Sequence, residues 1–229
     1  MKTEEYAIKN FQDLNKIAEA NVGAFTYYRG HRDSNWALRP KIGRLKFYGN
    51  KTLAELEKLM LNHFKQRSIP HIQRAHHNDW EWLALAQHHG LPTRLLDWTK
   101  NILVAAFFAV EQSHDGDSAI FSFKPKRNSI QIFESNPFNI KERYASFEPP
   151  FISTRIISQN GCFTIHSDPK LDFYPDSLVK YIIDISFRNR LLKLINKYGI
   201  NRSTLFPDLD GLSAYITWAY CDEPNKHSV

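Results

Sequence analysis

The sequence predicts a single compact α+β domain in which a mixed or antiparallel sheet packs against a buried central helix. A chain of 229 residues with 42% hydrophobic and 14% aromatic residues can bury a large core. Residues 103–111 are apolar on nearly every side, which is typical of a central helix. Strand-like and helix-like segments alternate without a regular βαβ rhythm, which favours α+β over a doubly wound fold. We expect a helical lead-in over 1–24, the domain over 25–220 and a C-terminal tail over 221–229.

Helix boundaries are clearest in the first half of the chain. Thr52 and Glu55 form a capping box before a helix that should end near Gln66. Gly90 is a typical stop for the helix that precedes it. We expect helices over 11–20, 53–66, 80–89 and 103–111, the last capped by Asp97 or Thr99, and a strand over 25–30 that meets a turn at its glycine.

In the second half, β-branched and aromatic residues predict the strands. Asn160 and Gly161 suggest a two-residue hairpin turn between two of them. Gly199 should end a basic helix. The expected strands are 118–123, 151–157, 162–166 and 180–186, and the expected helices are 188–198 and 208–220.

The charge balance is basic, with 30 lysines and arginines against 24 acidic residues and a net charge of +6. Such a protein attracts polyanions such as RNA, DNA, nucleotides or anionic lipid. Alternatively the charge serves only solubility, since the basic residues are scattered.

No apolar run approaches the length of about 18 residues that a membrane span needs, and the N-terminus does not resemble a secretory signal. Cys162 and Cys221 lack motif spacing, so we expect free thiols, a cytoplasmic location and no membrane partner.

Residues 81–106 crowd polar side chains among apolar ones, as the wall of a preorganised pocket would at a junction between helices. Those polar residues are Gln87, His88, His89, Arg94 and Asp97. The chain contains no phosphate-binding glycine loop, no zinc-protease motif, no nucleophile elbow and no paired Cys-x-x-Cys.

Several segments together resemble a bacterial and phage family, the FRG domain, named for a Phe/Tyr-Arg-Gly signature near its N-terminus. They are Tyr28-Arg29-Gly30, Trp36-x-Leu38-x-Pro40, residues 87–98 (QHHGLPTRLLDW), Gln159-x-Gly161-x-Phe163-Thr164-Ile165-His166 and residues 205–211 (LFPDLDG). The resemblance runs from about Phe25 to Ala214. It implies a protein associated with mobile elements or defence, and it assigns no reaction.

Arg29 is the first candidate site residue, because a guanidinium binds phosphate or carboxylate through two parallel hydrogen bonds. Gly30 beside it would let a ligand approach the backbone. The alternative is a structural ion pair with Asp97 or Asp208. For Arg94, just after a proline turn, we favour the structural role.

His88 and His89 end a predicted helix, where the helix dipole should raise the pKa of an imidazole. One of them is a candidate general acid or base. Adjacent helical side chains point about 100° apart, so both cannot serve one site equally. Alternatively one caps the helix and the other packs in the core. A metal site is not predicted, because zinc needs more ligands than this segment supplies.

Asp208 and Asp210 precede a predicted helix, where Asp208 as N-cap is the favoured interpretation. The alternative is that one of them orients a ribose hydroxyl or acts as a base. Trp98 is expected in the core or stacked on a base. The predicted catalytic residues are Arg29, His88, His89, Asp97, Asp208 and Asp210, and the predicted ligand-binding residues are Tyr28, Gly30, Gln87, Thr93, Arg94, Trp98, Ser153 and Gln159.

Three functions remain open, each involving a nucleotide, nucleic acid or partner protein. An arginine on an early strand, a Ser-Thr strand and a late acid resemble the layout of ADP-ribosyltransferases, with Arg29 on the phosphates of NAD and Ser153 in support. Those enzymes use glutamate where this chain has Asp208 or Asp210. The second is a metal-independent nuclease using His88 or His89 with arginines at the phosphorane. The third is a non-catalytic binding module.

In each case we expect Arg29, Arg94, Asp97 and one of the two histidines to converge on one cleft. Asp208 or Gln159 should lie on its far side. No cofactor other than NAD is suggested, and no metal.

Overall fold

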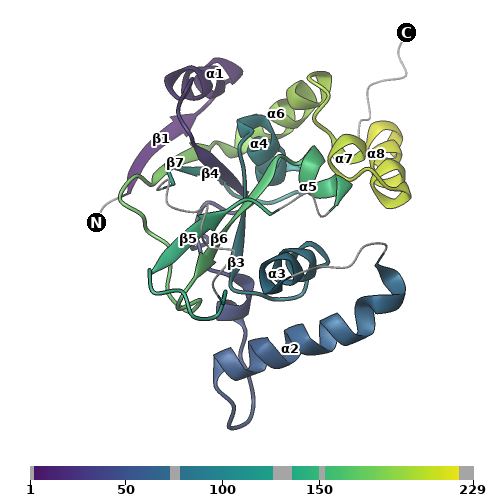
Figure 1. The fold of residues 1–229 in the computed structure, drawn as a ribbon. Coiled ribbons are helices and arrows are strands. Elements are labelled where there is room, and N and C mark those ends of the chain that lie inside the picture. Colours follow the sequence, from purple (N-terminus) through teal and green to yellow (C-terminus); the bar gives the residue numbers. More distant parts are fainter. Residues whose placement is uncertain (1–2, 73–77, 126–135, 150–152, 222–229) are drawn as a thin grey trace.

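The computed structural model describes residues 3–72, 78–125, 136–149 and 153–221. These residues build one sheet with the strand order β1-β7-β4-β2-β3-β6-β5 (Figure 1). The strands are β1 (Glu4–Ile8), β2 (Tyr27–His31), β3 (Leu95–Thr99), β4 (Ser118–Phe123), β5 (Tyr144–Phe147), β6 (Gly161–His166) and β7 (Val179–Ile183). The helices are α1 (Phe11–Ala20), α2 (Leu53–Ser68), α3 (Asp79–His88), α4 (Ile102–Val110), α5 (Thr154–Ser158), α6 (Ile185–Lys197), α7 (Arg202–Leu205) and α8 (Leu209–Cys221), with short 3₁₀ turns η1 (Lys41–Arg44) and η2 (Ile69–His71).

The sheet is mixed, because β1 pairs with β7 in parallel and the other neighbours pair antiparallel. The prediction of a single α+β domain around a mixed sheet is therefore confirmed. The central helix is confirmed as well, because most of α4 is buried. In place of a purely helical lead-in, β1 adds an edge strand that the sequence analysis missed.

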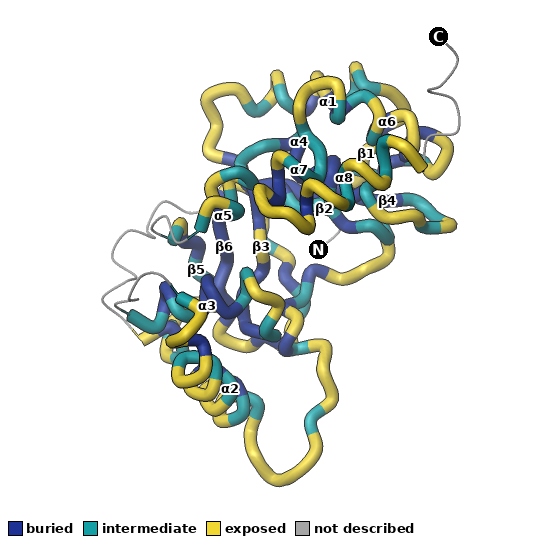
Figure 2. The backbone as a smooth tube through the Cα atoms, turned by 90° about the vertical axis from the view of Figure 1, so that its right-hand side faces the viewer, coloured by how far each residue is buried: buried dark blue, intermediate teal, exposed yellow. Residues whose placement is uncertain are grey.

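Two helical groups cover the same face of the sheet, one over each half. Tyr28 and Thr99 are paired and so share a face, and Tyr28 packs in the cluster of α4 and α6. Leu95, four residues before Thr99, points to that face too and packs in the cluster of α2 and α3. Figures 1 and 2 show α1, α4 and α6 at one end of the molecule and α2 and α3 at the other. A cluster rich in aromatic residues, including Phe123 and Phe173, covers the opposite face.

The sheet is split between β2 and β3. Among the described residues these strands share one residue pair, Tyr28 with Thr99, whereas β2 forms five pairs with β4 and β3 forms five with β6. Beyond that pair the two strands separate, and the ladder is open between the two halves of the fold.

Gly30 lies inside β2 rather than at a turn, which corrects the prediction. A Cβ atom at this position would lie 2.0 Å from the carbonyl oxygen of Ala105 and 2.6 Å from the backbone nitrogen of Ala109. The missing side chain therefore makes room for the backbone of α4, and not for a ligand as we had expected.

The local helix boundaries were predicted well. Thr52 and Glu55 form both hydrogen bonds of the capping box of α2, and α1 spans the expected residues. Gly90 and Gly199 follow α3 and α6 with φ of 84° and 80°, the left-handed conformation that glycine accepts without strain. The N-cap of α4 is Asn101, not Asp97 or Thr99, because those two residues lie in β3.

The region around residue 155 was predicted wrongly. Thr154–Ser158 is helix α5 and not a strand, and Ser153 caps it by accepting a hydrogen bond from the backbone nitrogen of Ile156. The first two residues of the predicted strand lie outside the described part of the chain. Asn160 does adopt a positive φ of 47°, but it joins a helix to β6, whose outer partner is β5.

The packing of Gly30 against α4 predicts a stability effect. Gly30→Ala should lower the free energy of unfolding by about 1–3 kcal/mol, because the new methyl group can be accommodated only if α4 moves away from β2. Gly116→Ala is the matched control, since its nearest neighbour is the His114 side chain at 3.2 Å, which can rotate. Urea denaturation of both variants measures the difference. Equal stability would contradict this account of the contact.

Candidate functional site

A cleft of about 400 Å³ opens at the split between β2 and β3, and residues from both faces of the sheet line it. Its walls come from the C-terminal turn of α3, from α4 and from α5, and its floor comes from β2, β3 and β6. Trp36 and Arg44, from the segment between β2 and α2, also line it. The cleft therefore collects side chains from both halves of the sheet.

Arg29 spans the split. Its Nη1 donates a hydrogen bond to the carbonyl oxygen of Asp97 at 2.6 Å, where a continuous ladder would place a backbone donor. The same nitrogen lies 3.6 Å from the carboxylate of Asp97. Burial lowers the pKa of Arg29 and the Asp97 carboxylate opposes this, and the group stays a cation because guanidinium does not deprotonate in proteins. Of the two structural partners considered for Arg29, the structure places Asp97 beside it.

His31 holds Arg29 from the other side and is neutral. Arg29 Nε donates to His31 Nε2 at 3.0 Å, so that nitrogen must be the unprotonated acceptor. The proton therefore sits on Nδ1, which lies 3.3 Å from the carbonyl oxygen of Trp36 and donates to it. Burial, assisted by the charge of Arg29, lowers the pKa of His31 to about 3.

Asp97 presents its carboxylate to the cleft, with 53% of the side chain exposed. Gln87 Nε2 donates to Asp97 Oδ2 at 2.8 Å, and the amide oxygen of Gln87 accepts from the Thr93 hydroxyl at 2.7 Å. The end of α3 and the turn after it thus fix the position of the carboxylate.

Arginines dominate the charge of the cleft. Among the described residues, the charged side chains that line it are Arg29, Arg32, Arg44, Arg155, Asp97 and Glu111. Glu111 is already paired with Arg202 at 2.7 Å. The side chains of Arg44 and Arg155 form no ion pair or hydrogen bond with the part of the chain that the structure describes. Burial lowers the pKa of both.

Arg155 and Arg32 are held by aromatic rings rather than by acids. The guanidinium of Arg155 lies 4.1 Å from the ring centre of Phe206, and that of Arg32 lies 5.1 Å from the ring centre of Trp36. Arg32 Nη1 donates to Gln112, while its buried Nε finds no hydrogen-bond partner within the described ranges. Both arginines therefore retain donors that a ligand can use.

The two adjacent histidines separate, as expected for neighbours on a helix. His88 lines the cleft, and His89 lines a different hollow between α2 and α3. We had expected the helix dipole to raise the pKa of these groups, and the structure corrects this. Burial lowers the pKa of His88 to about 4, with Arg155 adding to the effect, and lowers that of His89 in the same way. Both imidazoles are therefore neutral at neutral pH.

The predicted site residues divide into two groups. Those that line the cleft are Tyr28, Arg29, Gly30, Gln87, His88, Asp97, Trp98 and Gln159, and those that do not are His89, Thr93, Arg94, Ser153, Asp208 and Asp210. Gln159 Nε2 donates to the carbonyl oxygen of Leu205 at 3.1 Å. Ser153 caps α5 instead of supporting a strand at the pocket, which corrects its expected position.

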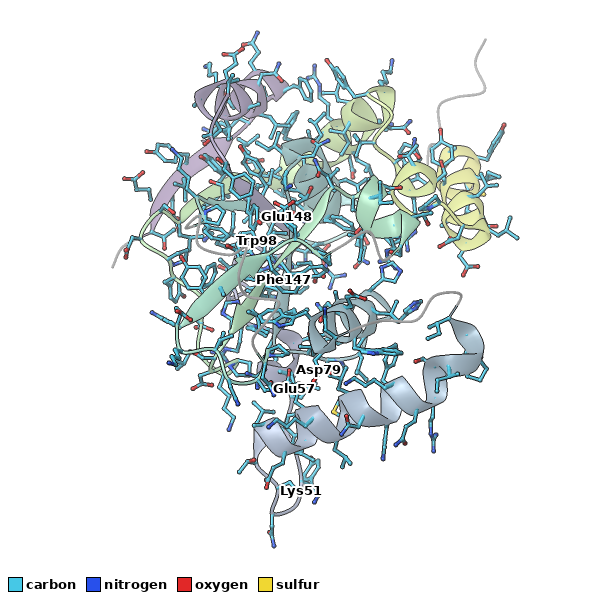
Figure 3. The ribbon with its side chains drawn as sticks, in the orientation of Figure 1. Lys51, Glu57, Asp79, Trp98, Phe147 and Glu148 are labelled. Carbon is cyan, nitrogen blue, oxygen red and sulfur yellow. The ribbon has the colours of Figure 1, made fainter. Side chains whose placement is uncertain are left out.

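Arg94 lies away from the cleft, contrary to the expected convergence. It is buried against Glu57 of α2, with Nε and Nη2 at 2.9 and 2.8 Å from Glu57 Oε2. Its backbone nitrogen donates to the other carboxylate oxygen at 2.8 Å. Figure 3 labels Glu57 on α2, at the side that faces the rest of the domain. The favoured interpretation of Arg94 as a structural residue agrees with this geometry.

The late aspartates lie at the start of α8. Asp208 accepts a hydrogen bond from the backbone nitrogen of Gly211 at 2.7 Å, as an N-cap would. Its charge still acts on His88 and Arg155, so it lies near the α5 end of the cleft. Asp210 belongs to the first turn of α8.

Two tryptophans that line the cleft differ in their exposure. Trp98 is 3% exposed and donates through Nε1 to the Thr164 hydroxyl at 2.9 Å, deep in the molecule (Figure 3). Trp36 is 41% exposed and lines the cleft. Sequence reasoning missed Arg44, Arg155 and Glu111. For Arg155 the available signal was Ser153, whose preference for helix N-caps places the next residues on a helix.

Within the described ranges, no group of three or more His, Cys, Asp or Glu residues is arranged to hold a metal ion. Across the same residues, no helix has the length and apolar character that crossing a membrane would require.

Residues 25–118 match the family model of the FRG domain. The matched range includes Arg29, Arg44, Gln87, His88 and Asp97, whereas the two later segments that resemble the family lie beyond it. The matched range thus supplies β2, β3 and the walls from α3 and α4, whereas α5 and β6 complete the cleft from outside the match. No curated protein and no solved structure matches this chain.

The buried histidines predict an acid-sensitive fold. His31 and His166 have pKa values lowered to about 3, against about 6.5 in the unfolded chain. Between these values the unfolded state binds protons that the folded state does not, so stability falls as the pH falls from about 6.5 toward 4. Each contributes up to about 1.4 kcal/mol per pH unit.

Urea denaturation between pH 7 and pH 4 measures this slope, and NMR titration follows the individual imidazoles. His88→Asn should make the slope shallower, because His88 also titrates at a lowered pKa of about 4. An imidazole of His31 or His166 that titrates near 6.5 in the folded protein would contradict the prediction.

Proposed function

We propose that the cleft of the FRG domain binds the phosphate groups of a nucleotide and that it acts on NAD, transferring the ADP-ribosyl group. The observation that carries the proposal is the excess of guanidinium groups. Four arginines line the cleft with two carboxylates, and Glu111 is already neutralised by Arg202. Arg44 and Arg155 hold no acid within hydrogen-bonding distance among the described residues. Bidentate binding to phosphate is the contact for which guanidinium geometry is best suited.

The rest of the cleft fits a nucleotide. Phe108 and the partly exposed Trp36 offer apolar surface for a base or nicotinamide ring. Gln159 leaves its amide oxygen available for a hydroxyl, while its amide nitrogen is held by Leu205. His31 and His88 are neutral, so they add no charge beyond that of the arginines.

Asp97 supports the transferase chemistry. Its carboxylate is exposed to the cleft, is fixed by Gln87 and lies beside Arg29. When the bond between nicotinamide and ribose breaks, nicotinamide leaves with the bonding electrons and positive charge develops on the ribose. A fixed carboxylate stabilises that charge until an acceptor bonds to the same carbon and loses a proton. Asp97 takes this role in the proposal instead of Asp208 or Asp210, and Ser153 has none.

A metal-independent nuclease fits the site less well. Such an enzyme needs a protonated acid as well as a base at neutral pH. His88 has a pKa near 4 and so carries no proton to donate as an imidazolium, and both ring nitrogens of His31 are engaged by Arg29 and Trp36.

The phosphate-binding role predicts a loss of affinity in Arg155→Ala. Isothermal titration with ADP-ribose should show binding at least about tenfold weaker, because one charge-assisted contact is removed. Arg190→Ala, an exposed arginine on α6 that does not line the cleft, is the matched control and should bind like the unaltered protein. Equal affinity in both variants would remove Arg155 from the proposed site.

The transferase step predicts that Asp97→Asn binds ADP-ribose normally and consumes NAD about 10²- to 10³-fold more slowly. Asparagine keeps the shape and an acceptor for Gln87, so the change isolates the negative charge. Release of nicotinamide, followed in the presence of cell lysate, measures the rate. An unaltered rate would show that Asp97 does not stabilise the reacting ribose.

A further inference from the structure

The segment between β2 and α2, residues 36–51, concentrates positive charge, and we name it the basic loop. It contains five lysines and arginines and no acidic residue. The whole chain has a net charge of +6, so most of that excess lies in this short stretch. A cluster of this kind produces a local positive potential that the overall composition does not reveal.

The basic loop also exposes large apolar side chains, a type that folded proteins usually bury in the core. Tyr48 is 92% exposed and Leu45 is 42% exposed, and Trp36 at the start of the loop is 41% exposed. In Figure 2 the segment is the mostly exposed stretch that extends from the sheet and leads into α2. Aromatic rings interleaved with basic side chains are the combination used to bind single-stranded nucleic acid.

Two of the five cations anchor the loop, and the others remain available. Arg39 is paired with Asp172 at 2.7 Å, and Lys41 donates to the carbonyl oxygen of Gly90 at 2.9 Å. The side chains of Arg44, Lys46 and Lys51 form no ion pair or hydrogen bond with residues that the structure describes. The base of the loop is therefore fixed to the domain while its tip presents free positive charge.

The basic loop is continuous with the cleft, because Trp36 and Arg44 belong to both. From these observations we propose that the basic loop binds a single-stranded nucleic acid and leads it to the mouth of the cleft. Lys46 and Lys51 contact the phosphates, and Tyr48 stacks on an unpaired base. The binding itself does not depend on the reaction in the cleft. That the bound strand is the acceptor of the transferred group rests on the proposed function.

Fluorescence anisotropy with a labelled single strand of about 20 nucleotides, longer than the site of one small domain, tests the proposal. The variant Lys46→Ala/Tyr48→Ala/Lys51→Ala should bind at least about tenfold more weakly, since it loses two phosphate contacts and one stacked base. The slope of log affinity against log salt should become shallower by about 1.4, or 0.7 for each phosphate contact.

Lys170→Ala/Tyr174→Ala is the matched control, because it removes an exposed lysine and an exposed tyrosine from a loop that also contains Asp168, Asp172 and Asp176. This variant should bind the strand as the unaltered protein does. A duplex of the same sequence should bind more weakly than the single strand, since its bases are not free to stack.

The two proposals fail separately. Arg155→Ala should lose ADP-ribose binding and retain the strand, whereas the basic-loop variant should do the reverse. Strand binding that survives the loop variant, or that is equally strong for the duplex, would overturn the inference. So would binding to vesicles containing phosphatidylserine in the absence of binding to the strand, because the loop would then be a membrane-binding surface.

Discussion

Arg29 spans the gap between β2 and β3 and takes the place of the backbone donors that a continuous ladder would supply there. Without this donor the carbonyl of Asp97 would depend on solvent for its hydrogen bond. The guanidinium therefore allows the sheet to remain split. The split in turn leaves the space above the strands open, so that the packed clusters of α4 and of α3 stay separate and a cleft forms between them.

Burial, reinforced by the charge of nearby arginines, determines the protonation of the histidines at the cleft. His31 accepts a hydrogen bond from Arg29 and His88 lies near Arg155, so a second positive charge on either imidazole would be both buried and repelled. The cleft consequently holds cations that cannot lose their protons and imidazoles that do not gain them at neutral pH. Among the basic groups that line the cleft, only the arginines are charged, and this positive charge stays constant around neutral pH.

Features encoded within a few residues could be predicted from the sequence, and those decided by distant packing could not. The capping box at Thr52 and the glycine stops at residues 90 and 199 are local, and they placed three helices correctly. Arg94 and Asp97 were expected in one pocket because polar side chains crowd residues 81–106. Asp97 lies in β3 and Arg94 directly precedes that strand, and residues three apart along an extended chain point in opposite directions. Arg155 joined the site only because α5 packs against β6, which no short pattern records.

Two ways of holding an arginine are present in the same chain, and the contrast between them bears on function. Arg94 is 3% exposed, and its guanidinium is paired with Glu57 Oε2 while its backbone nitrogen donates to Oε1. A buried guanidinium with a structural role is satisfied in this way. Arg155 is partly buried, yet the acids that act on it most, Asp97 and Asp208, bind Gln87 and cap α8 instead of forming an ion pair with it. A half-buried guanidinium without an acid costs stability, because desolvation is not offset by pairing. An anion from outside the chain would offset that cost, and the phosphate proposed to bind beside Arg155 and Arg44 would add its negative charge to that of Asp97.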